Sequence, residues 1–227
     1  MEEGRPFVTL KLAATADGRT ATHSGDSRWI TGEAARRLVH EWRATTDAVL
    51  VGGATARRDD PLLTVRGVGG RDPVRVVVDS RARLSPHAAM LHNGPKNVLV
   101  AATAKATKKR IAALSAAGAE VLVVAADTNG DVDTGELLRA LGKRGINTVL
   151  CEGGATLAGT LVANGLVDKV ALFYAPKLLG GGVAMLAGKG PGLVADAAVL
   201  REVTVKKVGD DFLLEAYVKR TGPASSR

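Results

Sequence analysis

The chain has little of the chemistry that cross-links secreted proteins or holds metal ions. Its 227 residues include a single cysteine, Cys151. One cysteine excludes an intramolecular disulfide and a multi-cysteine zinc site. Among the four histidines, His40, His87 and His92 lack ligand-like spacing. We therefore expect no metal site, and we interpret Cys151 as a buried strand residue without a catalytic role.

Aromatic side chains are also scarce, at 3% of the residues, although the chain is basic, with a formal net charge of +8. Proteins that bind single-stranded nucleic acids stack bases on aromatic rings beside clustered basic groups. Here the basic residues are dispersed along the sequence. We therefore expect no nucleic-acid partner, and we interpret the charge as a basic surface that suits phosphate-bearing ligands.

Long apolar runs are missing as well. None approaches the roughly 18 residues that a membrane-spanning helix needs, and the segment Met1–Pro6 is acidic and has no apolar signal core. These absences predict a cytoplasmic protein with no membrane partner. Because no low-complexity linker divides the chain, we expect a single domain over residues 1–220 and a flexible tail over residues 221–227.

Strand-like and helix-like segments alternate along the chain, which predicts an α/β fold with helices on the faces of a mostly parallel central sheet. Several of these strands are almost wholly aliphatic, as buried parallel strands are. The predicted strands are Phe7–Ala13, Ala48–Val51, Arg75–Asp79, Asn97–Ala101, Glu120–Val124, Thr148–Glu152 and Val170–Tyr174. At the end of the chain, Arg201–Val208 and Phe212–Lys219 predict a C-terminal antiparallel hairpin.

Three helices are predicted from apolar periodicity and stop residues. The first covers Glu33–Arg43, and the second covers Lys105–Ala117 and stops at Gly118. The third begins after Asp133 or Thr134 and stops near Gly145.

One local pattern occurs twice, an aliphatic strand followed by two glycines, an alanine and a threonine. The copies are Gly52–Thr55 and Gly153–Thr156. Glycines let a ligand approach the backbone, and a following helix directs free N–H groups at a phosphate. A tight turn that binds nothing is the alternative for either copy, but two copies at strand ends favour a nucleotide. An amphipathic helix follows the second copy, which makes it the better pyrophosphate site, at Gly153, Gly154, Ala155 and Thr156.

The usual dinucleotide and nucleotide motifs are absent. No G-x-G-x-x-G opens the first strand–helix turn, and no Walker lysine follows either glycine pair, which argues against a Rossmann dehydrogenase or a P-loop enzyme. Instead, hydroxyl and guanidinium side chains gather between Lys11 and Arg66. Because arginine binds phosphate through paired hydrogen bonds, this cluster favours a phosphorylated substrate.

Seven motifs in order give the chain a specific resemblance. They are KLAATADGRTA, SGDSRWIT, WRATTDAVLVGGAT, DDPLLTVR, PVRVVVDSRAR, VLCEGGATLAGTL and LVDKVALFYAPKLLGG. From about Pro6 to Val218 the chain resembles the reductase domain of riboflavin biosynthesis, the 5-amino-6-(5-phosphoribosylamino)uracil reductase family, whose fold is like that of dihydrofolate reductase.

The resemblance implies that NADPH delivers a hydride to C1′ of the substrate's ribosyl group, in its ring-opened imine form, to give a ribitylamino product. It implies substrate contacts at Ser27, Arg43, Leu63, Arg66 and Glu152. It implies cofactor contacts at Ala13, Trp29, Thr55, Asp59 and Ser80. It also implies cofactor contacts along the second glycine turn and the segment after it, at Gly153, Gly154, Ala155, Thr156, Leu157, Ala158, Gly159 and Thr160.

The chemistry of these side chains suits the implied roles. Ser27, Arg43 and Arg66 are candidate holders of the substrate phosphate. We expect Lys11 and Glu152 to be catalytic. Glu152 accepts hydrogen bonds from the pyrimidine amino groups or sugar hydroxyls, and Lys11 protonates or polarises the nitrogen or ring oxygen as the sugar opens. A surface lysine is the alternative for Lys11.

Two cofactor assignments have alternatives of their own. Ser80, with Arg81 or Arg83 nearby, suits a 2′-phosphate and so favours NADPH over NADH, although Asp79 would repel that phosphate if it pointed inward. Trp29 is interpreted as a wall of the nicotinamide site, or else as part of the core.

Several alternatives stay open at this point. The H-x-E and P-C-x-x-C elements of the zinc deaminase that is often fused to this reductase are absent, so we expect a stand-alone reductase. Its substrate is the phosphorylated ribosylaminopyrimidine, in the uracil form or the undeaminated diaminopyrimidinone form. A dihydrofolate-type or secondary-metabolite reductase and a nucleotide-binding regulator are the other candidates. The resemblance also suggests a homodimer, for which Val170–Leu179 is either interface strand or ordinary core.

Overall fold

The computed structural model describes residues 4–219 of the chain. Its contacts divide into two compact units, which we describe one at a time: Met1–Phe7 with Arg37–Gly154, and Val8–Arg36 with Ala155–Arg227. The prediction of a single domain is not tested by this division and stays a prediction. The predicted tail, residues 221–227, lies outside the described residues.

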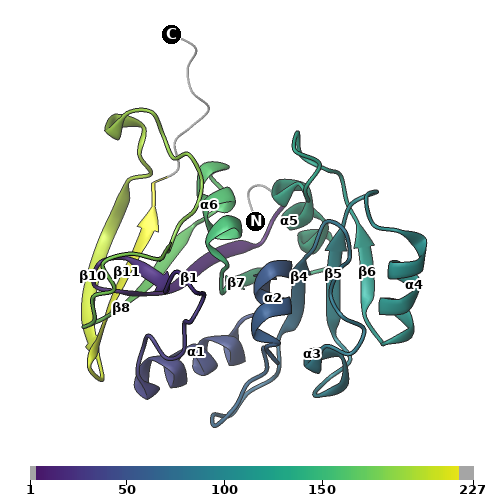
Figure 1. The fold of residues 1–227 in the computed structure, drawn as a ribbon, viewed down its shortest axis with the longest axis horizontal. Coiled ribbons are helices and arrows are strands. Elements are labelled where there is room, and N and C mark those ends of the chain that lie inside the picture. The colour runs from purple at the N-terminus through teal and green to yellow at the C-terminus, as the bar shows by residue number, and fades with distance from the viewer. Residues whose placement is uncertain (1–3, 220–227) are drawn as a thin grey trace. The chain divides into compact units, whose positions relative to one another are not determined.

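The first unit is built on parallel strands in the order β7-β3-β4-β5-β6 (Figure 1). The strands are β3 (Ala48–Gly52), β4 (Val74–Val78), β5 (Val98–Ala102), β6 (Glu120–Val123) and β7 (Thr148–Cys151). Each predicted strand of this unit is found, with ends that differ by at most one residue.

These strands form because their aliphatic side chains are buried on both faces. Every residue of β5 is buried, and so are the first four residues of β3. Val49, Val77, Val100 and Leu150 come from four strands and meet in one hydrophobic cluster. Burial of aliphatic side chains on both faces is the usual state of a parallel sheet. Cys151 lies in this buried layer as predicted, and burial raises the pKa of its thiol to about 12.

Helices precede or connect these strands. They are α1 (Glu33–Thr45), α2 (Gly53–Asp59), α3 (Ala89–His92), α4 (Lys108–Ala116) and α5 (Thr134–Lys143). Asp133 caps α5 by accepting a hydrogen bond from the Glu136 N–H at 2.9 Å. The predicted stops are confirmed: Gly118 and Gly145 follow α4 and α5 at φ values of 94° and 78°, a conformation that favours glycine.

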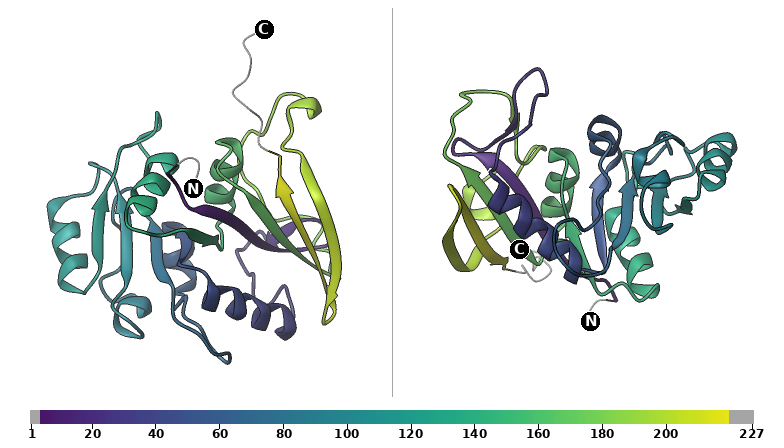
Figure 2. Two further views of the ribbon diagram at one scale, coloured as in Figure 1. Left: turned by 180° about the vertical axis from the view of Figure 1, so that it is seen from behind. Right: turned by 90° about the horizontal axis from the view of Figure 1, so that it is seen from below.

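The second unit contains a sheet with the strand order β10-β11-β8-β1. The strands are β1 (Phe7–Thr15), β8 (Lys169–Ala175), β10 (Leu200–Val208) and β11 (Asp211–Val218). β1 and β8 run parallel, whereas β11 is antiparallel to both β8 and β10. The predicted C-terminal hairpin is therefore confirmed, and it is drawn in yellow-green and yellow in Figures 1 and 2.

Four smaller elements complete this unit. β2 (Arg19–Ala21) pairs with β9 (Val183–Ala184) in a short antiparallel sheet. α6 (Ala155–Ala163) follows the second glycine pair, and a short 3₁₀ turn covers Val194–Asp196.

The strand β8 is core rather than a free edge, because β1 and β11 pair with its two sides. Val170, Ala171, Phe173 and Ala175 are all buried. A second copy therefore cannot pair with an edge of β8, whereas Leu178 and Leu179 after the strand are exposed. The role of Val170–Leu179 in a homodimer stays a prediction.

Candidate functional site

The two glycine turns lie side by side in the first unit. β3 and β7 are neighbouring parallel strands, so their carboxyl ends meet at one edge of the sheet. The Gly52 N–H donates to the Gly153 carbonyl at 3.2 Å. Gly153 and Gly154 have φ values of 98° and 90°. A Cβ on Gly154 would lie 2.7 Å from Thr55 Oγ1, so a side chain there would displace the Thr55 hydroxyl and would be strained at this φ.

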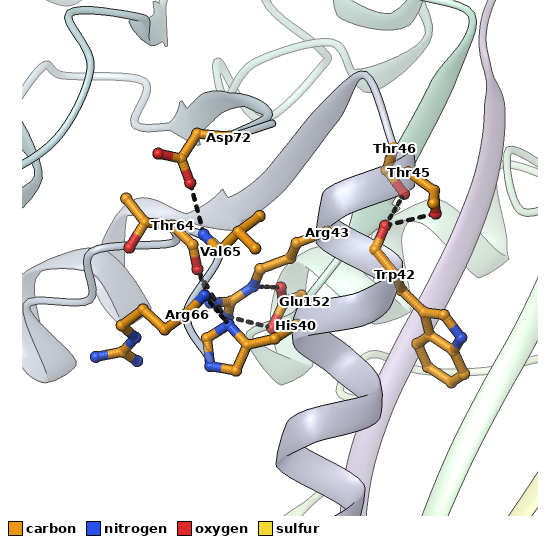
Figure 3. A network of polar contacts seen from close by, with 10 residues as sticks. All are labelled: His40, Trp42, Arg43, Thr45, Thr46, Thr64, Val65, Arg66, Asp72 and Glu152. Carbon is orange, nitrogen blue, oxygen red and sulfur yellow. Dashed lines mark hydrogen bonds and ion pairs between the residues drawn. The ribbon is translucent and has the colours of Figure 1, made fainter. Parts of the chain in front are cut away.

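Glu152 joins this edge of the sheet to α1 through an ion pair with Arg43 (Figure 3). The Arg43 Nε and Nη2 atoms donate to the two Glu152 carboxylate oxygens at 2.5 and 2.9 Å. Such two-point pairing fixes both side chains in orientation. The pair is largely buried, with side-chain exposures of 10% for Arg43 and 8% for Glu152.

The same arginine also holds the segment that follows α2. Its Nη1 donates to the Thr64 carbonyl at 3.0 Å. His40, one helical turn before Arg43, places Nδ1 3.2 Å from the Thr64 carbonyl oxygen and accepts the Arg66 N–H at 3.2 Å. From the other side, Asp72 accepts the Val65 N–H at 2.6 Å. Figure 3 shows these groups converging on the segment 64–66.

Burial and charge act in opposite directions on the two helix side chains. Burial lowers the pKa of Arg43, but the facing Glu152 carboxylate outweighs it, and the net pKa is raised. For His40, burial lowers the pKa first, and the nearby charges of Arg43 and Arg66 lower it further. The pair is therefore ionised, and the histidine favours its neutral form.

The predicted substrate residues of this unit fall into two groups. Arg43 and Glu152 are brought together directly. Arg66 is exposed, and its guanidinium points away from that pair in Figure 3. Leu63 has a buried side chain in the hydrophobic cluster and a φ of 56°, which is uncommon for a residue other than glycine. A ligand at this position would therefore meet the Leu63 backbone.

The predicted cofactor residues Thr55, Asp59 and Ser80 follow β3 and β4. Asp59 pairs with its neighbour Arg58 at 2.8 Å. The Ser80 hydroxyl accepts the Val132 N–H at 3.1 Å and can still donate a hydrogen bond of its own.

Asp79 does not present a free charge beside Ser80. Its carboxylate is buried, accepts the Leu84 N–H at 2.7 Å and pairs with Arg57 at 3.1 Å. Arg57 offsets the charge of Asp79, and this pairing reduces the repulsion between Asp79 and a phosphate at Ser80.

In the second unit, Lys11 and Ala13 lie on the same face of β1. They are half-buried and alternate with the buried residues Leu10 and Leu12. The Lys11 ammonium lies 5.9 Å from the centre of the Phe173 ring on β8.

Trp29 lies on the surface of this unit, with 65% of its area exposed. Plain core is therefore excluded as its role. The Arg36 guanidinium stacks on its ring, 4.6 Å from the ring centre. Lys177 donates to the Trp29 and Ile30 carbonyls at 2.8 and 2.9 Å, which holds the segment in place. Ser27, two residues earlier, is half-buried.

The predicted cofactor loop continues into α6. Leu157 and Ala158 have buried side chains, so a ligand would meet their backbone. Gly159 has a packing role of its own, because a Cβ there would lie 1.7 Å from the Ala187 carbonyl oxygen. The Ala187 N–H also donates to the Ala155 carbonyl at 3.0 Å. The segment around Ala187 thus lies directly against the first turns of α6.

Sequence reasoning missed His40, Thr64 and Asp72. His40 is three residues before Arg43 on the same helix, and this spacing places both side chains on one face. That spacing could have identified His40, but the roles of the Thr64 carbonyl and Asp72 depend on the folded loop. Within residues 4–219, no group of three His, Cys, Asp or Glu side chains is placed to hold a metal ion. No helix in that range is both long and apolar enough to cross a membrane.

The fold resembles that of dihydrofolate reductase. The structure of dihydrofolate reductase from Enterococcus faecalis superimposes with a TM-score of 0.51, covering 96% of this chain and 98% of that chain at 10% identity. This likeness concerns the fold alone, and it confirms the prediction of a dihydrofolate-reductase-like fold.

The family follows from closer matches. Residues 6–214 match the RibD C-terminal domain, and the chain belongs to that family. It is 40% identical to 2,5-diamino-6-ribosylamino-4(3H)-pyrimidinone 5′-phosphate reductase of Methanothermobacter thermautotrophicus, over 95% of this chain and 99% of that protein. It is 37% identical to the riboflavin biosynthesis protein RibD of Actinobacillus pleuropneumoniae, over 94% of this chain and 57% of that protein.

A solved structure agrees with these matches. Acinetobacter baumannii RibD superimposes with a TM-score of 0.83 at 34% identity, covering 97% of this chain and 60% of that one. The chain thus spans somewhat more than half of the RibD proteins that it matches.

Proposed function

We propose that the chain is an NADPH-dependent pyrimidine reductase of riboflavin biosynthesis. Its substrate is 5-amino-6-(5-phosphoribosylamino)uracil, and its product is the ribitylamino compound. The observation that carries the proposal is Glu152, which stands immediately before a paired glycine turn and is oriented by Arg43. A carboxylate for the substrate and a turn for a dinucleotide therefore adjoin in the sequence and in the fold.

The names of the relatives support the same activity. The Methanothermobacter thermautotrophicus relative is named as a pyrimidinone phosphate reductase, and the Actinobacillus pleuropneumoniae relative as a riboflavin biosynthesis protein.

The residues around the second glycine pair fit a dinucleotide. Gly153 and Gly154 have positive φ, and a Cβ on Gly154 would lie 2.7 Å from the Thr55 hydroxyl oxygen. A glycine turn that leads from the end of a parallel strand into a helix suits a pyrophosphate. The Ser80 hydroxyl and the offset charge of Asp79 support a preference for the 2′-phosphate of NADPH. When bound, the cofactor supplies the hydride that reduces C1′.

The two arginines take different parts in substrate binding. Arg43 donates three hydrogen bonds within the protein, two to the Glu152 carboxylate and one to the Thr64 carbonyl. We therefore assign Arg43 to orienting Glu152 and the segment 64–66. The exposed Arg66 is the principal candidate of the first unit for the substrate phosphate, and Ser27 is the candidate of the second unit.

The reaction balances with these assignments. The exocyclic nitrogen forms a double bond to C1′ as the C1′–O4′ bond breaks, and O4′ takes a proton. Hydride addition to C1′ then returns the nitrogen to an amine, so overall the substrate gains one hydride and one proton, and NADPH is oxidised to NADP⁺. Lys11 is the proposed proton donor to O4′, and Glu152 is the proposed acceptor of hydrogen bonds from the pyrimidine amino groups or the sugar hydroxyls.

A second candidate concerns the form of the pyrimidine. The Methanothermobacter thermautotrophicus relative, covered over 99% of its length, is named for the undeaminated diamino compound. The same site would serve this substrate, because the ribosyl phosphate and the reacting C1′ are shared.

An assay with both pyrimidines tests the proposal. Purified protein is mixed with NADPH and either substrate, the absorbance of NADPH is followed, and the ribitylamino product is identified by mass spectrometry. We expect oxidation that depends on a phosphoribosylaminopyrimidine, faster with the uracil form. Oxidation with dihydrofolate and with neither pyrimidine would contradict the proposal. NADPH binding without turnover of any of the three would instead support a nucleotide-binding regulator.

We also propose a cytoplasmic homodimer. Light scattering of the purified chain measures its mass directly, and a monomer mass at micromolar concentration would contradict the dimer.

A further inference from the structure

His40 contacts the backbone of the residue that is proposed to hold the substrate phosphate. Its Nδ1 lies 3.2 Å from the Arg66 nitrogen and 3.2 Å from the Thr64 carbonyl oxygen. Both atoms belong to the segment that Arg43 and Asp72 also hold. His40 is therefore the link between α1 and the Arg66 backbone itself.

The two contacts require opposite protonation states of the same ring nitrogen. Without a proton, Nδ1 accepts the Arg66 N–H. With a proton, Nδ1 donates to the Thr64 carbonyl and can no longer accept from Arg66. Arg43 already donates to that carbonyl at 3.0 Å. The neutral ring therefore satisfies one more backbone group than the charged ring does.

The charges around His40 favour the neutral ring. Arg43 on the same helix and Arg66 on the facing segment both oppose a positive charge, and burial acts in the same direction. The Thr64 carbonyl and then the Glu152 carboxylate after β7 act in the opposite direction on the pKa of His40, and Glu152 is already paired with Arg43. The net result is a lowered pKa for His40.

We propose that neutral His40 is a positioning residue that fixes Arg66 for the substrate phosphate, and that its protonation weakens substrate binding. This inference rests on the proposed function through the role given to Arg66. His40 acts through the Arg66 backbone and not on the reacting atoms, so its effect falls on the KM for the pyrimidine. The KM for NADPH and the turnover number at saturation are unaffected.

Two variants separate the hydrogen bond from the titration. In His40→Asn, the amide oxygen can take the place of Nδ1 as an acceptor and does not titrate. In His40→Leu, no acceptor remains. His92→Asn is the matched control, because His92 contacts the Pro86 carbonyl and lies outside this network.

The experiment measures both KM values for each protein between about pH 5 and 8, the range in which histidines titrate. We expect the pyrimidine KM of the wild type and of His92→Asn to rise as the pH falls. His40→Leu should have a KM raised roughly 3- to 10-fold near neutral pH, as loss of one hydrogen bond implies. His40→Asn should keep a low KM near neutral pH. The substrate phosphate itself titrates near pH 6, so both His40 variants retain the pH dependence due to the phosphate and lose only the part due to His40.

Three outcomes would overturn the inference. One is a KM–pH profile of His40→Asn identical to that of the wild type. Another is an equal rise of both KM values in His40→Leu. The last is an NMR spectrum of the ligand-free protein in which neutral His40 carries its proton on Nδ1. Failure of the proposed function is distinguishable from these outcomes, because the wild type would then turn over neither pyrimidine, whatever the His40 tautomer.

Discussion

Arg43 and Glu152 lie 109 positions apart in the sequence, yet they meet in a two-point ion pair with distances of 2.5 and 2.9 Å. Both were predicted as substrate contacts, and the structure shows them holding one another. A substrate that engages Glu152 therefore meets a carboxylate that is already oriented and charge-balanced.

We expect Glu152→Gln to reduce turnover and to lower the free energy of unfolding by about 1–3 kcal/mol, because a neutral amide faces a buried guanidinium less favourably than a carboxylate does. The protein should stay folded, since this loss is smaller than a typical stability of about 5–15 kcal/mol. Urea unfolding followed by circular dichroism measures the loss. The double variant Arg43→Met/Glu152→Gln should lose less than the sum of the single variants, and strict additivity would show that the pair is not coupled.

Arg66→Ala should raise the KM for the pyrimidine substrate by about 10- to 100-fold, which corresponds to one charge-assisted hydrogen bond of about 1.5–3 kcal/mol. The KM for NADPH should change little, because Arg66 is assigned to the substrate phosphate alone. Steady-state kinetics with each reactant varied in turn gives both values. Arg139→Ala is the control: Arg139 pairs with Glu136 on the surface of α5, and its loss should alter neither constant. Equal effects of Arg66→Ala on the two KM values would refute its phosphate role.

The buried strands could be predicted closely because their aliphatic runs leave few alternatives. The predicted strand Glu120–Val124 is found as β6, Glu120–Val123. Short elements could not be predicted in this way. β2 forms only because Arg19 and Ala21 pair with Val183 and Ala184, far along the chain.

The candidate site was predicted in outline for a similar reason. The glycine repeat identified the edge of the sheet, because each copy follows an aliphatic strand. It could not show that Gly154 faces Thr55, since that contact depends on β3 and β7 being neighbours. The contact of His40 with the Arg66 N–H likewise depends on how the segment after α2 folds back onto α1.

The burial of Arg75 could not be predicted from the sequence, because an arginine in an aliphatic strand is usually exposed. Its guanidinium is fully buried. It donates to the Met90 carbonyl at 2.8 Å, to the Pro95 carbonyl and to the Asn97 side chain. We expect Arg75→Met to destabilise the protein by about 3 kcal/mol or more, because several buried acceptors lose a donor at once. Thermal unfolding of this variant should be compared with that of Arg71→Met, whose guanidinium is exposed. A similar small loss in both would contradict the structural role of Arg75.

Asp17 provides a test at acid pH. Its pKa is lowered to about 2, first by the hydrogen bond from the Thr15 hydroxyl at 2.6 Å and next by the Leu179 N–H. A carboxylate with a lowered pKa stabilises the fold above its unfolded value, which is about 4, and this contribution is lost as the pH falls toward 2. We expect NMR titration to give a pKa near 2 for Asp17 and a higher value in Thr15→Val. Thr20→Val is the control, since the Thr20 hydroxyl contacts the Val183 carbonyl instead. An unchanged Asp17 pKa in Thr15→Val would show that the hydroxyl is not the cause.

Gly159 tests whether the glycine-rich loop is shaped by packing within the chain. A Cβ at this position would lie 1.7 Å from the Ala187 carbonyl oxygen, so Gly159→Ala must displace the segment around Ala187 from α6. We expect a net loss of about 1–3 kcal/mol in the free energy of unfolding, as for overpacking elsewhere, although alanine favours a helix intrinsically. In Gly192→Ala, the added Cβ meets nothing within 4 Å, and the stability should be nearly unchanged. Hydrogen exchange of the Ala187 N–H, which donates to the Ala155 carbonyl, should accelerate in Gly159→Ala alone. If Gly159→Ala instead keeps its stability and its exchange rates and loses only NADPH affinity, the glycine serves the cofactor rather than the packing.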